Sequence, residues 1–256
     1  MPTLSVAIVT HNEEANLART LASVTWADQI VVVDSHSTDR TVEIARSFNT
    51  TVIERAWPGF AEQKNFALAQ CTGDWLLSLD ADEELTSELQ QEIQSLLTKQ
   101  PAAEGFYLKR RNLFLGRWIK RGGFYPDAKL RLFRRSAEAT PSFTVRPVHE
   151  VIHFTGSTAT LHGDLIHHAY PTLSDYIEHM DRYSSLGADV LVAKGRTSRS
   201  LLTFITTTAL IPALTFVKNY LFRFGFSDGR EGFLLHLYHA AYTSWKYAKA
   251  WEKDRQ

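Results

Sequence analysis

Residues 73–85, GDWLLSLDADEEL, join an apolar run to a tight acidic cluster. The run at residues 75–79 is typical of a buried strand. Four acidic residues follow it within five positions: Asp80, Asp82, Glu83 and Glu84. Carboxylates this close together repel one another unless solvent or a cation lies among them. The stretch therefore predicts a buried strand that ends at a polar site.

The chain before this strand alternates between two periodicities. Short apolar runs rich in branched residues predict parallel strands at 4–10, 29–34, 50–55 and 75–80. The segments between them, such as 13–24 and 39–48, have the apolar spacing of helices. This alternation predicts a doubly wound α/β sheet. Ligands bind such sheets beyond the carboxyl ends of the strands, which here carry residues 10–13, 34–37 and 80–82.

The rest of the chain changes character twice. Residues 86–97 predict a helix, with Ser87 and Gln90 at capping-box spacing. Residues 105–152 are rich in aromatic and branched residues, which favours further strands of a mixed sheet. From Leu173 onward the pattern is helical. We therefore expect an α/β domain over residues 1–170 and a helical extension over residues 171–256.

An uncharged segment at residues 201–217 lies between Arg199 and Lys218. Pro212 and several threonines interrupt it, and a spanning helix needs about 20 predominantly apolar residues. We interpret the segment as an interfacial or re-entrant helix, with a buried core helix as the alternative. Aromatic and basic residues alternate in 218–226 and suit a bilayer interface, although they also suit an ordinary docking helix.

The composition limits the partners and the compartment. Lysine and arginine balance aspartate and glutamate at 28 each, so no overall charge attracts the chain to nucleic acid. Locally, residues 109–135 are strongly basic, with Asp127 as their acidic residue, which suggests a surface for anions. Cys71 is the single cysteine; it excludes an internal disulfide, fits a reducing compartment and is expected to be buried. The N-terminus shows no signal-peptide pattern, so we expect a cytoplasmic protein.

The acidic cluster has the chemistry of a metal site. Asp80 and Asp82 point the same way if the strand continues, so they can share one Mg²⁺ or Mn²⁺ with substrate phosphates. The alternative, solvated acids that cap the next helix, suits Glu83 and Glu84 better. The chain has neither a G-x-G-x-x-G motif after the first strand nor a Walker A motif. Any phosphate charge must therefore be met by metal and by lysine or arginine.

Three segments in this order and spacing resemble the inverting family 2 glycosyltransferases: SVAIVTHNEEANLARTLASV, IVVVDSHSTDRTVEIA and FAEQKNFALAQCTGDWLLSLDADEEL. Later segments resemble the lipopolysaccharide core β-1,4-glucosyltransferase branch: GRWIKRGGFYPDAKLRLFRR, VHEVI, GDLIHHAY and YLFRFGFSDGREGF. The resemblance implies the GT-A fold, a Rossmann-like mixed sheet flanked by helices. It also implies transfer of glucose from UDP-glucose to a glycolipid or core oligosaccharide, with possible peripheral contact with the inner membrane.

The resemblance further implies a donor site of strand-end and cationic residues: Thr10, Asn12, Glu13, Asp34, Ser37, Lys64, Asp80, Arg131 and Arg134. Thr10 and Glu13 would flank the nucleobase. Asp34 would accept hydrogen bonds from the base or ribose, and Lys64 would approach the diphosphate. Asp80 would contact ribose or the metal, and Asp82 would bind the metal that joins both phosphates.

Each of these roles has a structural alternative. Asn12 and Glu13 could cap a helix, and Asp34 and Ser37 could form a turn. Lys64 could be an exposed helix lysine. Arg131 and Arg134 could belong to a solvated strand face.

An inverting transfer needs one base near the acceptor hydroxyl. We favour Glu150 in VRPVHEVI over Asp127 in YPDAKLRLFRR, and we assign the neighbouring His149 a structural role. His162, His167 and His168 have only Asp164 as a nearby acidic residue in the sequence, so we interpret them as structural. Two other functions remain open at this point: an aspartate-based phosphotransferase, and a non-catalytic sugar or lipid binder on the same fold.

Overall fold

The computed structural model describes residues 2–99, 101–136, 141–144 and 151–255. The described chain divides into two compact units. The sheet unit contains residues up to 111, then 127–144 and 151–168. The helical unit contains residues 112–126 and those from 169 onward.

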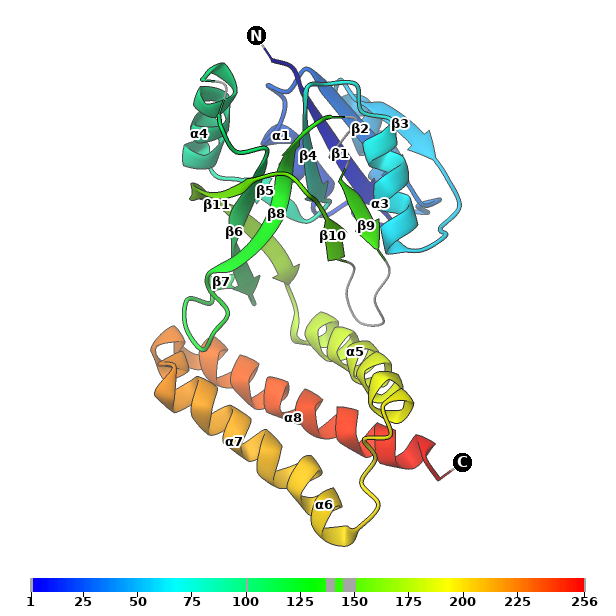
Figure 1. Cartoon of the computed structure of the whole chain (residues 1–256), viewed down its shortest axis with the longest axis vertical. Helices are drawn as coiled ribbons and strands as arrows, with labels where there is room; N and C mark the ends of the chain where they lie inside the picture. The colour runs from blue at the N-terminus through cyan, green and yellow to red at the C-terminus, as the bar shows by residue number, and fades with distance from the viewer. Residues whose placement is uncertain (1, 100, 137–140, 145–150, 256) are drawn as a thin grey trace. The chain divides into compact units, whose positions relative to one another are not determined.

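The sheet unit begins with the four predicted parallel strands (Figure 1). They are β1 (Leu4–Thr10), β2 (Gln29–Asp34), β3 (Thr51–Glu54) and β4 (Trp75–Asp80), in the spatial order β3-β2-β1-β4. The connecting helices are α1 (Leu17–Ala22), α2 (Thr41–Ser47) and α3 (Phe60–Ala69). The predicted doubly wound alternation is confirmed.

Beyond β4 the sheet becomes antiparallel. The added strands are β5 (Glu83–Leu85), β6 (Gly105–Phe114), β7 (Arg117–Trp118), β8 (Asp127–Arg134) and β11 (Thr158–Tyr170). Their spatial order after β4 is β8-β6-β11-β5, with β7 paired to β6. A separate pair joins β9 (Ser142–Thr144) to β10 (Val151–His153). The mixed sheet predicted for this region is confirmed.

Both faces of the central strands are buried, which explains their nearly continuous apolar sequences. On one face Val6 and Ile8 pack with side chains of α1, α2 and α4 (Ser87–Thr98). On the other face Ala7 packs with side chains of α3 and β9. Cys71 belongs to this second cluster, where burial raises the pKa of its thiol to about 12. It is an inert core residue, as expected.

The N-terminus of α4 differs in detail from the prediction. Thr86 is the N-cap, and its hydroxyl accepts a hydrogen bond from the backbone N–H of Leu89 at 3.3 Å. Ser87 is the first residue inside the helix. The capping box predicted at Ser87 and Gln90 is therefore wrong by one position, because the preceding threonine satisfies the free backbone donor.

The helical unit is built around one long helix, α8 (Gly229–Lys253). Helix α5 (Leu173–Ala193) packs along it (Figure 1). A second continuous helix also packs along α8. It consists of α6 (Leu201–Ile205), the π-helical turn η1 (Thr206–Leu210), α7 (Ile211–Val217) and the π-helical turn η2 (Lys218–Phe222). A 3₁₀ turn, η3 (Gly225–Asp228), leads into α8.

His236 of α8 is buried against glycine backbone. A Cβ atom at Gly122 would lie 1.9 Å from His236 Cε1, and one at Gly225 would lie 2.2 Å from His236 Nε2. Gly122 also has a φ of +69°, which disfavours any residue with a side chain. Neither ring nitrogen of His236 has a hydrogen-bond partner among the described residues. Burial and the neighbouring His239 lower the pKa of His236 to about 4, although Asp228 opposes them.

We expect the free energy of unfolding to fall as the pH is lowered from 6.5 towards 4. In that window the unfolded chain binds a proton at His236 and the folded chain does not, so acid favours unfolding. The contribution is up to about 3 kcal/mol. Urea unfolding at several pH values measures it. His236→Leu should flatten the slope and the exposed-site control His153→Leu should not, whereas equal slopes for the native chain and His236→Leu would contradict the assignment.

Candidate active site

Polar side chains meet at the carboxyl ends of three adjacent parallel strands. Thr10 pairs in register with Asp34, and Val9 pairs with Asp80. Thr10 and Asp34 are 5% and 0% exposed. The hydroxyl of Thr10 has no hydrogen-bond partner among the described residues. A buried hydroxyl of this kind points to a ligand that completes the site.

The loops after β1 and β2 are joined by hydrogen bonds. Asp34 accepts one from the Ser37 hydroxyl at 2.5 Å and one from the Ser37 backbone N–H at 2.8 Å. The backbone N–H of Asn12 donates to the Ser37 hydroxyl at 2.8 Å, and Asn12 Oδ1 accepts from Thr38 N–H at 2.8 Å. Asn12 and Ser37 therefore hold the rim of the site in shape. Each Asp34 oxygen keeps a lone pair for a further donor.

Glu13 lies at the same edge and senses the other carboxylates. Its side chain accepts a hydrogen bond from Asn16 Nδ2 at 2.9 Å. Burial raises the pKa of Glu13; the Asn16 bond lowers it, and the charges of Asp82 and Asp80 raise it further. The net pKa is raised. Burial is therefore the main reason that Glu13 holds its proton more tightly than usual, and the neighbouring carboxylates add to it.

Asp80 is held between two buried cations. Lys64 Nζ of α3 lies 2.8 Å from Asp80 Oδ1, and Arg131 Nη2 of β8 lies 2.5 Å from Asp80 Oδ2. Burial raises the pKa of Asp80, but Arg131 and Lys64 outweigh it and hold the pKa well below its usual range. Lys64 and Arg131 are each 5% exposed. The alternatives of an exposed helix lysine and a solvated strand face are therefore wrong for these two residues.

Glu83 is also buried, contrary to the interpretation that it is solvated. Its Oε1 lies 2.6 Å from Arg131 Nη2 and 3.1 Å from Arg110 Nη1. Its Oε2 accepts the backbone N–H of Asp80 at 3.0 Å. These three donors satisfy the carboxylate of Glu83, so it does not need the solvent that we expected around it. Glu84 is half-buried, and its Oε1 lies 3.1 Å from His168 Nε2.

Asp127 is fixed in the same ion-pair network. It accepts hydrogen bonds from Arg110 Nε at 2.9 Å and from Arg110 Nη2 at 2.5 Å, and Lys129 Nζ lies at 3.1 Å. Burial raises the pKa of Asp127, but Arg110 and Lys129 bring it down to about 2. A carboxylate with this pKa is a weak base at neutral pH.

Asp82 has a partner that the sequence analysis missed. His167 Nε2 lies 3.2 Å from Asp82 Oδ2, and the Asp82 carbonyl accepts the backbone N–H of His168 at 2.9 Å. Strand β11 makes this contact because it pairs antiparallel with β5, with His167 opposite Glu83. Burial raises the pKa of Asp82, and His167 lowers it to give a net decrease. Asp82 and His167 are far apart in sequence, so the residues around the histidines give no sign of this contact.

The residues at this edge fit a divalent cation that takes few protein ligands. No group of three or more metal-ligating side chains occurs among the residues that the structure describes. Both oxygens of Asp80 are engaged by cations, so Asp80 is not available while those ion pairs hold. The next carboxylate of the motif, Asp82, lies beside an imidazole nitrogen, with its Oδ2 3.2 Å from His167 Nε2. Mg²⁺ and Mn²⁺ typically combine such a small set with substrate phosphates.

Two predicted site residues that the structure describes, Arg134 and Asp127, do not belong to the strand-end group. Arg134 is exposed and pairs with Trp75 at the opposite end of β4. Glu150 lies outside the described residues, as does His149. The strand-end group therefore contains Thr10, Asn12, Glu13, Asp34, Ser37, Lys64, Asp80, Asp82 and Arg131, with His167 added by the structure.

Comparison with known proteins gives consistent matches. Residues 5–148 match the family model described as Glycosyl transferase family 2. The chain is 33% identical to an uncharacterized glycosyltransferase of Rickettsia prowazekii, over 91% of this chain and 82% of the relative. It is 31% identical to the lipopolysaccharide core biosynthesis glycosyltransferase LpsC of Rhizobium meliloti, over 98% of this chain and 92% of the relative. Its structure resembles the mannosyltransferase PcManGT of Pyrobaculum calidifontis, solved in complex with GDP-Man and Mn²⁺, with a TM-score of 0.56 and 17% identity over 98% of this chain and 88% of that one.

We expect Glu83→Gln to destabilise the protein by about 3 kcal/mol or more, because it leaves the buried Arg110 and Arg131 without one compensating charge. Urea unfolding measures the change. The exposed Glu88→Gln is the matched control and should change stability by less than about 0.5 kcal/mol. If both variants were equally mild, the ion-pair network would not constrain the site as described.

Proposed function

Because the chain belongs to glycosyl transferase family 2, we propose that it is a metal-dependent inverting enzyme that transfers glucose from UDP-glucose to a glycolipid acceptor. The family and the GT-A fold make the chain a glycosyltransferase and remove the phosphotransferase alternative. The observation that carries the proposal is the strand-end group, in which Asp80 contacts the buried cations Lys64 and Arg131 and Asp82 contacts His167. This arrangement suits a nucleoside diphosphate.

The donor site in this proposal is built from buried polar and charged residues at the strand ends. The nucleoside binds at the ends of β1 and β2, where the unpaired Thr10 hydroxyl donates to or accepts from it. Asp34 accepts from the ribose or the base with its remaining lone pairs. Lys64 and Arg131 supply positive potential for the diphosphate, and the buried Nε of Arg131 has no hydrogen-bond partner among the described residues.

Asp82 and His167 are the residues that we propose hold the divalent cation. When bound, the cation would neutralise the diphosphate and make it a better leaving group. Asp80 then has a different task from that of a ligand. It keeps Lys64 and Arg131 in place, so that their charge is already organised before the donor arrives.

The transfer itself needs a base on the acceptor side of the sugar. In an inverting reaction the acceptor oxygen forms a bond to the anomeric carbon while the bond from that carbon to the UDP oxygen breaks. The base takes the acceptor hydroxyl proton, and the electron pair of the broken bond leaves with UDP. We propose Glu150 for this role, because Asp127 is paired with Arg110 and Lys129 and has a pKa of about 2.

We propose that the acceptor belongs to lipopolysaccharide core or another cell-envelope glycan. The support is the relative LpsC, whose name refers to lipopolysaccharide core biosynthesis and which matches this chain along almost its whole length. The single, buried cysteine agrees with the proposed cytoplasmic location. A glycolipid acceptor would place the enzyme at a membrane surface.

We expect UDP to bind more tightly by at least about tenfold when Mn²⁺ is present, because a cation held by Asp82 would offset the charge of the phosphates. Isothermal titration calorimetry with and without Mn²⁺ measures this. Asp82→Ala should abolish the metal-dependent gain, and the exposed Glu88→Ala should keep it. If neither Mn²⁺ nor Mg²⁺ raised the affinity for UDP above its metal-free value, the result would argue for a metal-independent transferase.

Glu150→Gln should lower the rate of transfer by about 10²- to 10⁴-fold, because a general base contributes this much. UDP affinity should stay within about twofold, which separates chemistry from donor binding. Asp127→Asn is the comparison and should lower the rate much less, although it weakens the Arg110 ion pair. Transfer assays with UDP-glucose and core acceptors measure both variants; a larger loss in Asp127→Asn would reverse the assignment.

A further inference from the structure

The helix from Leu201 to Phe222 has an exposed apolar surface. It is 22 residues long, has a mean hydropathy of 1.6 over its most apolar window, and only 6% of that window is buried. The alternative of a buried core helix is therefore wrong. Exposed apolar side chains, between 50% and 77% accessible, form what we call the apolar face: Leu201, Leu202, Ile205, Leu210, Leu214, Leu221 and Phe222. Patches of this kind on soluble proteins mark interaction sites.

The threonine hydroxyls of this helix form hydrogen bonds within the helix and do not require water. The hydroxyls of Thr206, Thr207 and Thr208 donate to the carbonyls of Leu202, Thr203 and Phe204, at 2.8, 2.9 and 2.6 Å. Thr215 donates to Ile211 O at 2.8 Å in the same way. Because each hydroxyl is satisfied by the turn before it, the helix can enter a less polar environment without leaving these donors unpaired.

The packing of the helix argues against a membrane-spanning arrangement. It lies along α8 over its whole length (Figure 1). Helix α8 carries charged residues from end to end, including Arg230, Lys246, Lys249 and Glu252. A spanning helix would draw these charges into the hydrocarbon at high cost. A helix that lies in the plane of the interface exposes only its apolar face.

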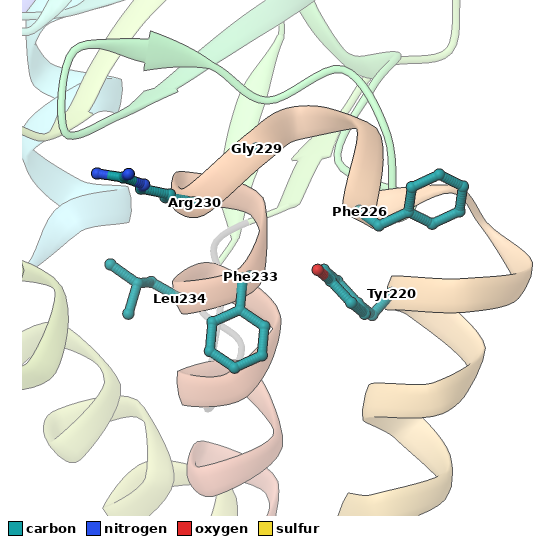
Figure 2. Close-up of a pocket in the computed structure, with 6 residues that line it drawn as sticks. All are labelled: Tyr220, Phe226, Gly229, Arg230, Phe233 and Leu234. Atoms are coloured by element: carbon teal, nitrogen blue, oxygen red, sulfur yellow. The ribbon is translucent and has the colours of Figure 1, made fainter.

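A hollow of about 550 Å³ adjoins the end of this helix. It is lined by Tyr220, Phe226, Gly229, Arg230, Phe233 and Leu234. Figure 2 shows Phe233 of α8 facing Tyr220, with Phe226 on the preceding turn. The ring centroids of Tyr220 and Phe233 are 5.6 Å apart. An aromatic-lined hollow with an arginine among its lining residues suits an acyl chain that carries an anionic head group.

Basic residues flank the apolar face on both sides in sequence. They are Lys194, Arg196 and Arg199 before the helix, and Lys218, Arg223 and Arg230 at or after its end. Within residues 194–230 the acidic residue is Asp228, and it is buried and accepts the backbone N–H groups of Lys120 and Arg121. Beyond this range, Asp254 Oδ2 lies 4.0 Å from Arg199 Nε, and Glu231 Oε2 lies 3.5 Å from Arg117 Nη1. With six basic residues against these acids, the region keeps a net positive charge. Anionic phospholipid head groups complement it.

We propose that the apolar face, together with the aromatic hollow, binds peripherally to a bilayer that contains anionic phospholipid. The helix lies in the plane of the interface, its leucines enter the acyl region and its flanking cations contact phosphates. This surface goes beyond the transfer chemistry and does not depend on the donor assignment. It supplies the proposed reaction with a way to reach a lipid-borne acceptor.

Flotation of the full chain with vesicles tests this proposal. We expect the protein to float with vesicles of equal phosphatidylglycerol and phosphatidylcholine, and to bind vesicles of phosphatidylcholine alone at least about fivefold more weakly. L210E/L214E should lower the partition constant at least about tenfold, since it places charge on the inserted face. Leu186→Glu, a matched change at an exposed leucine of α5, should bind as the native chain does.

Two further variants test the contribution of the flanking cations to membrane binding. Lys218→Gln and Arg230→Gln should each weaken binding to anionic vesicles about fivefold and leave binding to neutral vesicles unchanged. Circular dichroism and thermal unfolding verify that every variant folds.

Two results would overturn the proposal. One is failure of the native chain to bind anionic vesicles. The other is a dimer in light scattering that L210E/L214E dissociates while vesicle binding is absent, which would assign the face to a second copy. Hydrolysis of UDP-glucose without vesicles should be unchanged in L210E/L214E, so failure of the membrane surface and failure of the transferase assignment give different results.

Discussion

The site depends on Arg131, which neutralises two carboxylates that the chain places side by side. Asp80 and Glu83 lie at the end of β4 and the start of β5, and both contact Arg131 Nη2. Without this cation their burial would cost more than the surrounding packing could offset. Strand β8 places Arg131 beside these carboxylates because β8 runs antiparallel to β4, with Leu132 opposite Leu77. The antiparallel half of the sheet therefore makes the acidic motif of the parallel half possible.

This arrangement divides the two aspartates of the motif between different tasks. Asp80 is satisfied within the protein by Lys64 and Arg131, whereas Asp82 meets the ring of His167. Two cations therefore lie beside the first aspartate, and an imidazole lies beside the second. These contacts are already formed in the protein alone, so the proposed donor would require little reorganisation of them. The two aspartates of the motif have different partners and are not equivalent.

Local patterns predicted the fold well because each parallel strand and helix has a recognisable periodicity within a short stretch of sequence. The runs at β1, β2 and β4 and the buried Cys71 follow from periodicity and composition alone. The state of Glu83 and the position of His167 could not be predicted in this way. Their partners, Arg131 and Asp82, are far away in sequence and come close only through the register of β8 and β11. Whether a charged residue is buried depends on such long-range partners, and the neighbouring residues in the sequence do not reveal them.

The same reasoning changes the meaning of the basic stretch at residues 109–135. As a sequence it suggests a surface for anions, but Arg110, Arg111 and Arg131 are paired with Glu83, Asp127 and Asp164 inside the sheet unit. Their charge organises the site and is not available to a lipid head group. Of the cations around the apolar helix, Arg199 lies 4.0 Å from Asp254, whereas the nearby acid Asp228 is engaged by backbone donors. Attraction to an anionic bilayer would therefore come from the helical unit, because these arginines of the sheet unit are paired with its own carboxylates.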